Sequence, residues 1–150
     1  MNVENETRMK RLEAQAGHEI PAEYKKYVLP LSATDKPEMC YFHYDRNGGK
    51  QWDWIAMFYA LVSPDMKFTL AGQHDLFAKV IPRGCLPIAG TSVDCILLRL
   101  SGDRAGECVI RNWEDWQNSD GMRNDGVHVV APSFTALREM LQGDPGRENM

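Results

Sequence analysis

His43 and Asp45 have the residue types and the spacing of a metal-binding or acid–base pair. They lie two positions apart in a segment rich in strand-forming residues, so both side chains would project from the same face of a strand. Polar pairs of this kind are common at strand ends without any chemical role, and we favour this structural interpretation of His43 and Asp45. A small hydrolase that uses His43 and nearby carboxylates stays open as the enzymatic alternative.

Further carboxylates could take part in acid–base chemistry if the fold brought two of them together, although the sequence singles out no pair. They are Asp53, Asp94, Glu114 and Asp115. The neighbours His74 and Asp75 have a structural interpretation instead, because an acidic residue in the first turn of a helix is stabilised by the helix dipole. We therefore predict a short helix that begins at this pair.

The common catalytic motifs do not occur in this sequence. It contains no GxSxG nucleophile elbow and neither of the phosphate-binding motifs GxxxxGK[ST] and GxGxxG. Cys40, Cys85, Cys95 and Cys108 include no CxxC pair, and the histidines do not supply the missing zinc ligands. We expect four reduced thiols packed as small hydrophobic side chains, and no catalytic residue, metal or cofactor.

Two groups of aromatic residues could bind a partner. Trp113, Glu114, Asp115 and Trp116 lie at a strand end that opens a polar loop, where exposed aromatics beside carboxylates would suit docking to a basic protein. We take these four as the candidate partner-binding residues. A second group contains Trp52 and Trp54, which alternate along one strand. They form either a sheet face covered by helices or another aromatic patch for a partner.

Helical patterns occur at both ends of the chain. Met9, Leu12 and Ala16 have helical spacing, with Gly17 placed to end that helix. A second helix should start at Pro21, bury Tyr24, Tyr27 and Val28, and stop before Pro30. Two later helices are expected, one over residues 74–81 and one capped by Ser133 and ended by Gly143. The last would bury Phe134, Leu137, Met140 and Leu141.

Strand patterns fill the middle of the chain. The clearest is a hairpin of residues 39–44 and 51–59, joined by a turn at Asn47 and Gly48. Simple alternation would place Trp52, Trp54, Ala56 and Phe58 on one face of the return strand. Residues 94–100, 107–113 and 127–131 should form further strands, and residues 86–90 precede them. We therefore predict an α+β fold with one mostly antiparallel sheet, and N-terminal and C-terminal helices packed against it.

Composition limits the class of protein and its partners. The 150 residues suit one domain, which we expect to span 1–150 with a core of about 7–142 and a flexible tail at 143–150. The sequence shows no apolar run long enough for a membrane span and no signal-peptide core, so we expect a cytoplasmic protein that binds no membrane. A net charge of −4 with scattered basic residues argues against direct nucleic-acid binding and is compatible with a basic protein partner.

The order of several segments resembles a known family. These are residues 12–17, 20–27, 86–90, 94–100, 106–113 and 130–137, the last with the pair Ser133 and Phe134 opening a helix. From Leu12 to Leu141 the chain resembles the SUKH superfamily of immunity and regulatory proteins. It departs from that pattern at residues 29–32, where the family often has Asn-Gly-Gly, and Asn47 to Gly49 come too late to be equated with that motif.

The resemblance implies a non-enzymatic domain that binds another protein. Bacterial members look like antidotes that occlude a toxin, and a basic nuclease domain is one class of toxin that fits. Other members are regulatory scaffolds, which is the alternative function. No catalytic residues are implied. We expect a monomer or a weak homodimer that meets a secreted or contact-dependent toxin.

Overall fold

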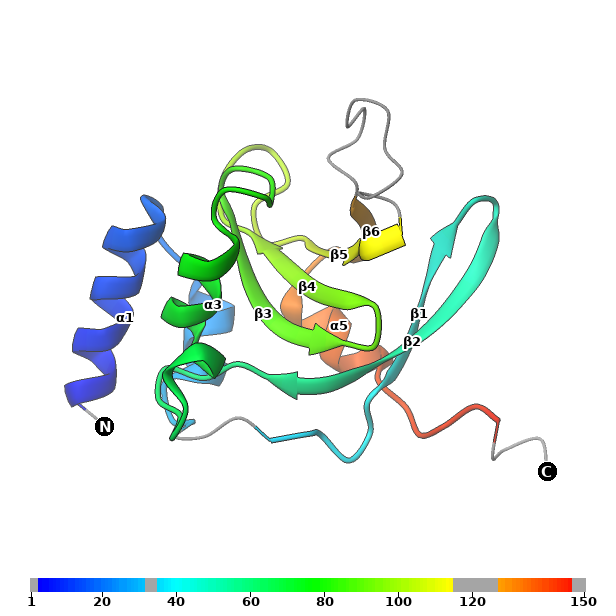
Figure 1. Cartoon of the computed structure of the whole chain (residues 1–150), viewed down its shortest axis with the longest axis horizontal. Helices are drawn as coiled ribbons and strands as arrows, with labels where there is room; N and C mark the ends of the chain where they lie inside the picture. The colour runs from blue at the N-terminus through cyan, green and yellow to red at the C-terminus, as the bar shows by residue number, and fades with distance from the viewer. Residues whose placement is uncertain (1–2, 32–34, 115–126, 147–150) are drawn as a thin grey trace.

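The fold is built on one antiparallel sheet with helices from both chain ends packed against it (Figure 1). The computed structural model describes residues 3–31, 35–114 and 127–146. Within these residues six strands are hydrogen-bonded in chain order, β1 to β6, which confirms the predicted α+β class. The strands are β1 (Tyr41–Arg46), β2 (Gly49–Phe58), β3 (Cys85–Thr91), β4 (Asp94–Arg99), β5 (Cys108–Asn112) and β6 (Val127–Ala131). The helices are α1 (Val3–Ala16), α2 (Ala22–Val28), η1 (Met66–Phe68), α3 (Leu70–Phe77) and α5 (Phe134–Met140).

The N-terminal helices form where the spacing predicts them. Met9 and Leu12 of α1 are buried, and α1 ends at Gly17, whose φ of 75° only glycine adopts without strain. The packed region nevertheless starts earlier than the predicted residue 7. Asn5 is only 2% exposed, because its side-chain amide donates a hydrogen bond to Leu29 O (2.7 Å) beyond α2. A polar residue near the chain end gave no sign of this long-range contact.

The β1–β2 hairpin confirms the predicted turn but corrects one face. Asn47 and Gly48 have φ values of 53° and 81°, as a tight hairpin turn requires. Trp54 and Ala56 are exposed, whereas Phe58 is 6% exposed and lies in the core. The reason is a β-bulge at Ala56, since Ile55 pairs with Thr91 and Met57 with Gly90. The extra residue reverses the alternation, so Phe58 does not share a face with the tryptophans.

Helix α3 begins four residues before the predicted start at His74. Thr69 caps it, since the Thr69 hydroxyl accepts a hydrogen bond from Gly72 N–H (3.0 Å). His74 and Asp75 therefore lie in the second half of the helix, and the assignment of Asp75 to the helix start is wrong. A Thr cap followed by Leu, Ala and Gly is a weak sequence signal, because the capping residue opens a segment with little amphipathic pattern.

The main core lies between one sheet face and the helices α1, α2 and α5. Phe134 of α5 is 1% exposed and packs against Tyr24 and Tyr27 of α2, with ring centroids 4.8 Å away in each case. Ser133 caps α5 as predicted, accepting from Ala136 N–H (3.0 Å). Leu137 is buried, but Met140 and Leu141 are only half-buried. The helix ends at Met140 rather than at Gly143, because Leu141 is already extended.

A smaller cluster covers part of the opposite face of the sheet. It contains Ile81, Cys85, Cys95, Leu97, Val109 and Val127, with Phe77 of α3 packed against it. All four cysteines are buried and none is in a disulfide, as the sequence predicted. No helix within the described ranges is both long enough and apolar enough to cross a membrane.

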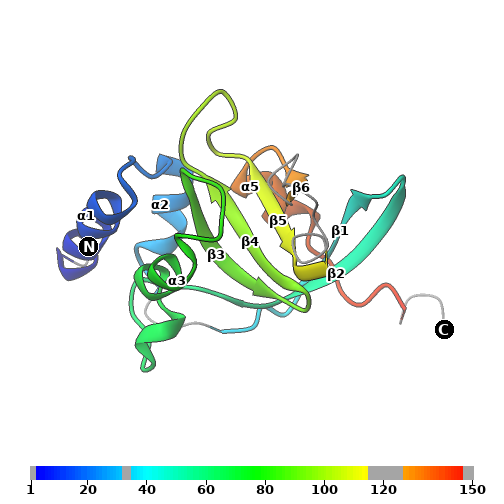
Figure 2. The same ribbon diagram turned by 45° about the horizontal axis from the view of Figure 1, so that its top comes forward.

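The sheet curls so that its first strand approaches its last (Figure 2). The ring of Tyr44 on β1 lies 5.7 Å from that of His128 on β6, and Asn112 Nδ2 of β5 donates to the Tyr44 hydroxyl (3.2 Å). Tyr41 also exchanges backbone hydrogen bonds with Gln142 after α5. The β1–β2 hairpin from Tyr41 to Trp54, here called the arm, ends in the Asn47–Gly48 turn.

Candidate protein-binding surface

The outer face of the arm carries four ring-bearing side chains in two direct cross-strand pairs. Tyr41 pairs with Trp54 and His43 with Trp52, with ring centroids 5.8 Å and 4.9 Å apart. We call these four residues the aromatic ladder. Trp54 is 40% exposed and the other three are half-buried. Cross-strand pairs of this kind hold each ring in place before any partner arrives.

The ladder faces outward because the other face of the hairpin is committed to the core. Phe42 and Ile55 are fully buried and Tyr44 is 3% exposed. Since side chains alternate along a strand, Tyr41, His43, Trp52 and Trp54 must point the other way. The structure therefore decides between the two interpretations of Trp52 and Trp54: they lie on an open face, and Trp54 is not covered by a helix of the described residues.

A buried carboxylate holds the ladder strand in position. Asp53 is 1% exposed, and its Oδ1 accepts from Trp54 N–H (2.6 Å) and from the backbone and hydroxyl of Ser92 in the β3–β4 turn. These contacts tie the middle of β2 to the next hairpin. The backbone beneath Trp54 is thus fixed by a contact 39 positions away in the sequence.

Two of the four predicted site residues lie within the described part of the chain. Trp113 follows β5 and is 44% exposed, as the binding-site hypothesis requires. Glu114 forms an ion pair with Arg46 of β1 (3.1 Å), and its N–H donates to Asn112 Oδ1 (3.0 Å). Asp115 and Trp116 lie outside the described residues.

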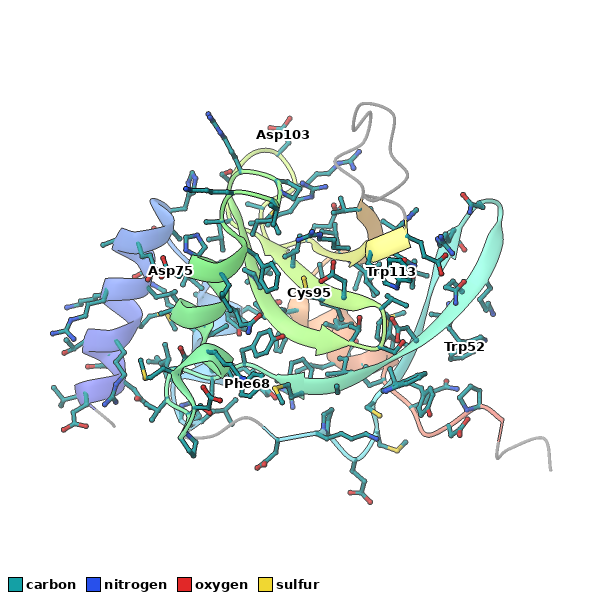
Figure 3. The ribbon with its side chains drawn as sticks, viewed as in Figure 1. Trp52, Phe68, Asp75, Cys95, Asp103 and Trp113 are labelled. Atoms are coloured by element: carbon teal, nitrogen blue, oxygen red, sulfur yellow. The ribbon has the colours of Figure 1, made fainter. Side chains whose placement is uncertain are left out.

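The ladder and Trp113 belong to two sides of the arm. Arg46 shares the alternation of Phe42 and Tyr44, so Glu114 approaches the arm from its inner side. Figure 3 shows Trp113 between the end of β5 and the arm, and Trp52 on the arm's outer side. Aromatic residues therefore lie on both sides of the arm: Trp52 on its outer face, and Trp113, which follows β5, on the other side. The sequence pointed to both groups but did not show that the arm separates them.

Among the described residues, the candidate catalytic side chains are engaged in separate contacts, and Asp115 lies outside these residues. His43 and Asp45 share the outer face as predicted, but His43 packs on Trp52, and Asp45 stands opposite Lys50. Asp53 is bound by Ser92, Asp94 by Arg111 (3.1 Å) and Glu114 by Arg46, so each of these carboxylates has a partner of its own. No cluster of three or more His, Cys, Asp or Glu side chains suited to a metal ion occurs in residues 3–31, 35–114 and 127–146.

Burial makes the thiols of Cys95 and Cys108 poor nucleophiles. Burial, together with nearby Glu23 and Glu107, raises the pKa of Cys108 to about 12. Burial likewise raises the pKa of Cys95 far above its ordinary value, with Asp94 adding to the effect. Because the thiolate is the reactive form, neither side chain is activated near neutral pH.

No protein-family model, curated protein sequence or solved structure matches this chain.

Proposed function

We propose that this chain is a protein-binding domain that neutralises a toxin protein by covering its working surface. The observation that carries the binding role is the aromatic ladder, whose rings are already paired on the arm and whose Trp54 is exposed. The toxin as the class of partner rests on the resemblance of the sequence to SUKH immunity proteins. Occlusion needs no catalytic residue in this chain.

Aromatic side chains on a rigid hairpin are efficient anchors. Trp and Tyr dominate binding hot spots because each buries a large area at a small cost in side-chain entropy. In the ladder that cost is reduced further, since Trp54 rests against Tyr41 and Trp52 against His43 before binding. A partner pocket that accepts Trp54 would therefore gain most of the available binding free energy.

Charge would act mainly on the rate of encounter. The chain carries a net charge of −4, which favours approach of a basic partner such as a nuclease domain. The tip of the arm is mixed, with Asp45 beside Lys50, and Glu114 is already paired with Arg46. We therefore assign specificity to the aromatic anchors and only the salt dependence of association to the overall charge.

The test is binding and inhibition of the toxin domain encoded beside this gene. Replacing Trp54 by Ala should cost about 2 kcal/mol or more of binding free energy, and Trp113→Ala should show whether the second side takes part. Leu76→Ala is the matched control, because Leu76 is a large side chain, 62% exposed, on α3. Calorimetry measures the affinity, and each variant must keep the melting temperature of the parent chain.

Two outcomes would contradict different parts of the proposal. If the neighbouring gene product is not bound at micromolar concentration, the antidote function fails and a regulatory scaffold of the same fold takes its place. If it is bound and inhibited while Trp54→Ala and Trp113→Ala are both silent, the assigned surface is wrong.

A further inference from the structure

A separate cavity of about 360 Å³ lies between α1 and the segment that leads from β2 into α3. Its size falls at the lower end of the range for small-molecule sites. The apolar part of its lining comes from Leu12, Leu61, Val62, Met66 and Ala71. Figure 2 shows α1 and α3 side by side at the end of the molecule opposite the arm. The cavity is therefore remote from the aromatic ladder.

Hydrogen bonds within the protein hold the cavity walls in place and use the polar groups of those walls. Thr69 is 1% exposed, and its hydroxyl donates to Met66 O (2.7 Å) while accepting from Gly72 N–H. A Cβ at Gly72 would lie 2.2 Å from Met66 O, so glycine allows η1 to pack closely on α3. Gln15 Nε2 donates to Ala71 O (3.1 Å) and bridges α1 to α3.

Two arginines give the lining of this cavity a positive formal charge. Arg8 is partly engaged, since it donates to Asn5 Oδ1 (2.9 Å) and lies 3.6 Å from Glu4. Arg11 also lines the cavity; this residue is exposed, and its side chain makes no hydrogen bond or ion pair with any residue that the structure describes. The neighbouring His74, 2.9 Å from Gln15, adds no charge near neutral pH, because burial lowers its pKa despite Asp75.

We propose that this cavity binds a medium-chain carboxylate, with the apolar chain against Leu12, Leu61 and Val62 and the carboxylate at Arg11. An apolar lining beneath a cationic rim is complementary to a ligand that is apolar with one anionic end. A cation would be repelled by Arg8 and Arg11, and a fully polar ligand would leave the apolar walls unused. A neutral alcohol of the same length lacks the partner for Arg11.

The test is a titration of the full chain with sodium octanoate, in which binding is monitored through the amide chemical shifts. Octanoate should change the amide shifts of α1 and α3 residues in a saturable way, with a Kd on the order of 1 mM. Octanol should bind about fivefold or more weakly, because it makes no charge-assisted contact with Arg11. Hexanoate should bind more weakly than octanoate, with about a fourfold loss of affinity for each methylene removed.

Variants locate the site. Arg11→Gln should weaken octanoate binding about fivefold or more, whereas Lys10→Gln on the same helix, which does not line the cavity, should leave it unchanged. Ala71→Phe should fill the cavity and abolish binding. Equal affinity for octanol and octanoate, no saturation by about 10 mM, or unchanged binding in Arg11→Gln would overturn the proposal. The comparison of octanol with octanoate uses the parent chain, so it decides the matter even if Ala71→Phe does not fold.

Discussion

Glu13 joins α1 to α2 through two contacts of one carboxylate. Its Oε2 accepts from Ile20 N–H (2.7 Å) and lies 2.8 Å from Lys25 Nζ. Burial acts to raise the pKa of Glu13, but the contacts with Lys25 and Ile20 outweigh it and leave the pKa below its usual value of 4.5. The charged form of this residue therefore stabilises the folded state.

Replacing Glu13 by Gln should lower the free energy of unfolding by about 1 kcal/mol near neutral pH. Because the folded pKa is lowered, the stabilisation is fully present above the unfolded value of 4.5 and is lost as pH falls through the lower folded value. The difference between parent and variant should thus shrink towards acid pH. Urea unfolding at a series of pH values measures it. Glu19→Gln, at a side chain 88% exposed and 3.9 Å from Lys25, is the control and should change little.

At the scale of elements, caps decide where the short helices begin. The first turn of α5 leaves backbone donors unsatisfied, and two of them find side-chain acceptors. Ala136 N–H donates to Ser133 Oγ (3.0 Å), and Thr135 N–H donates to Glu23 Oε1 of α2 (2.9 Å). A seven-residue helix has too few internal hydrogen bonds to form alone, so these caps and the packing of Phe134 hold it.

Ser133→Ala should cost about 1 kcal/mol of stability, because it removes the acceptor for Ala136 N–H. Ser133→Asp should retain most of the stability of the parent chain. A carboxylate at this position accepts the same hydrogen bond and interacts favourably with the helix dipole. Chemical denaturation of the three proteins gives the comparison. Equal stability of the Ala variant and the parent would show that Glu23 and packing suffice.

At the scale of the whole molecule, Phe134 connects the last helix with the first half of the chain. Its ring is close to those of Tyr24, Tyr27 and Phe58, the last at 6.0 Å between centroids. Three elements from distant parts of the sequence therefore meet at one side chain. Such a junction makes the unfolding of α2, β2 and α5 depend on one another.

Phe134→Ala should reduce the free energy of unfolding by about 3–5 kcal/mol, the usual cost of removing a buried aromatic ring. Phe134→Leu should cost less, because Leu fills part of the cavity. Unfolding in urea followed by circular dichroism and by tryptophan fluorescence provides the measurement. Coincident transitions are expected for the parent chain. A small loss for Phe134→Ala, or separate transitions in the parent, would contradict this junction.

Features that depend on neighbours in the chain could be predicted from the sequence alone. The Asn47–Gly48 turn, the end of α1 at Gly17 and the cap at Ser133 all follow from local backbone chemistry. The α+β class followed from the order of these local patterns. Trp113 was singled out by its residue type at a strand end, and it is exposed.

Features that depend on contacts between distant residues were decided by the tertiary structure. The bulge at Ala56 arises from pairing with β3, and it places Phe58 in the core, on the face opposite to that of Trp54. The curl of the sheet brought Glu114 to Arg46, 68 positions away. The arginine-lined cavity exists only because α1 packs beside α3. Alternation and capping are properties of a segment, whereas pairing register and helix packing are fixed by partners that no local pattern identifies.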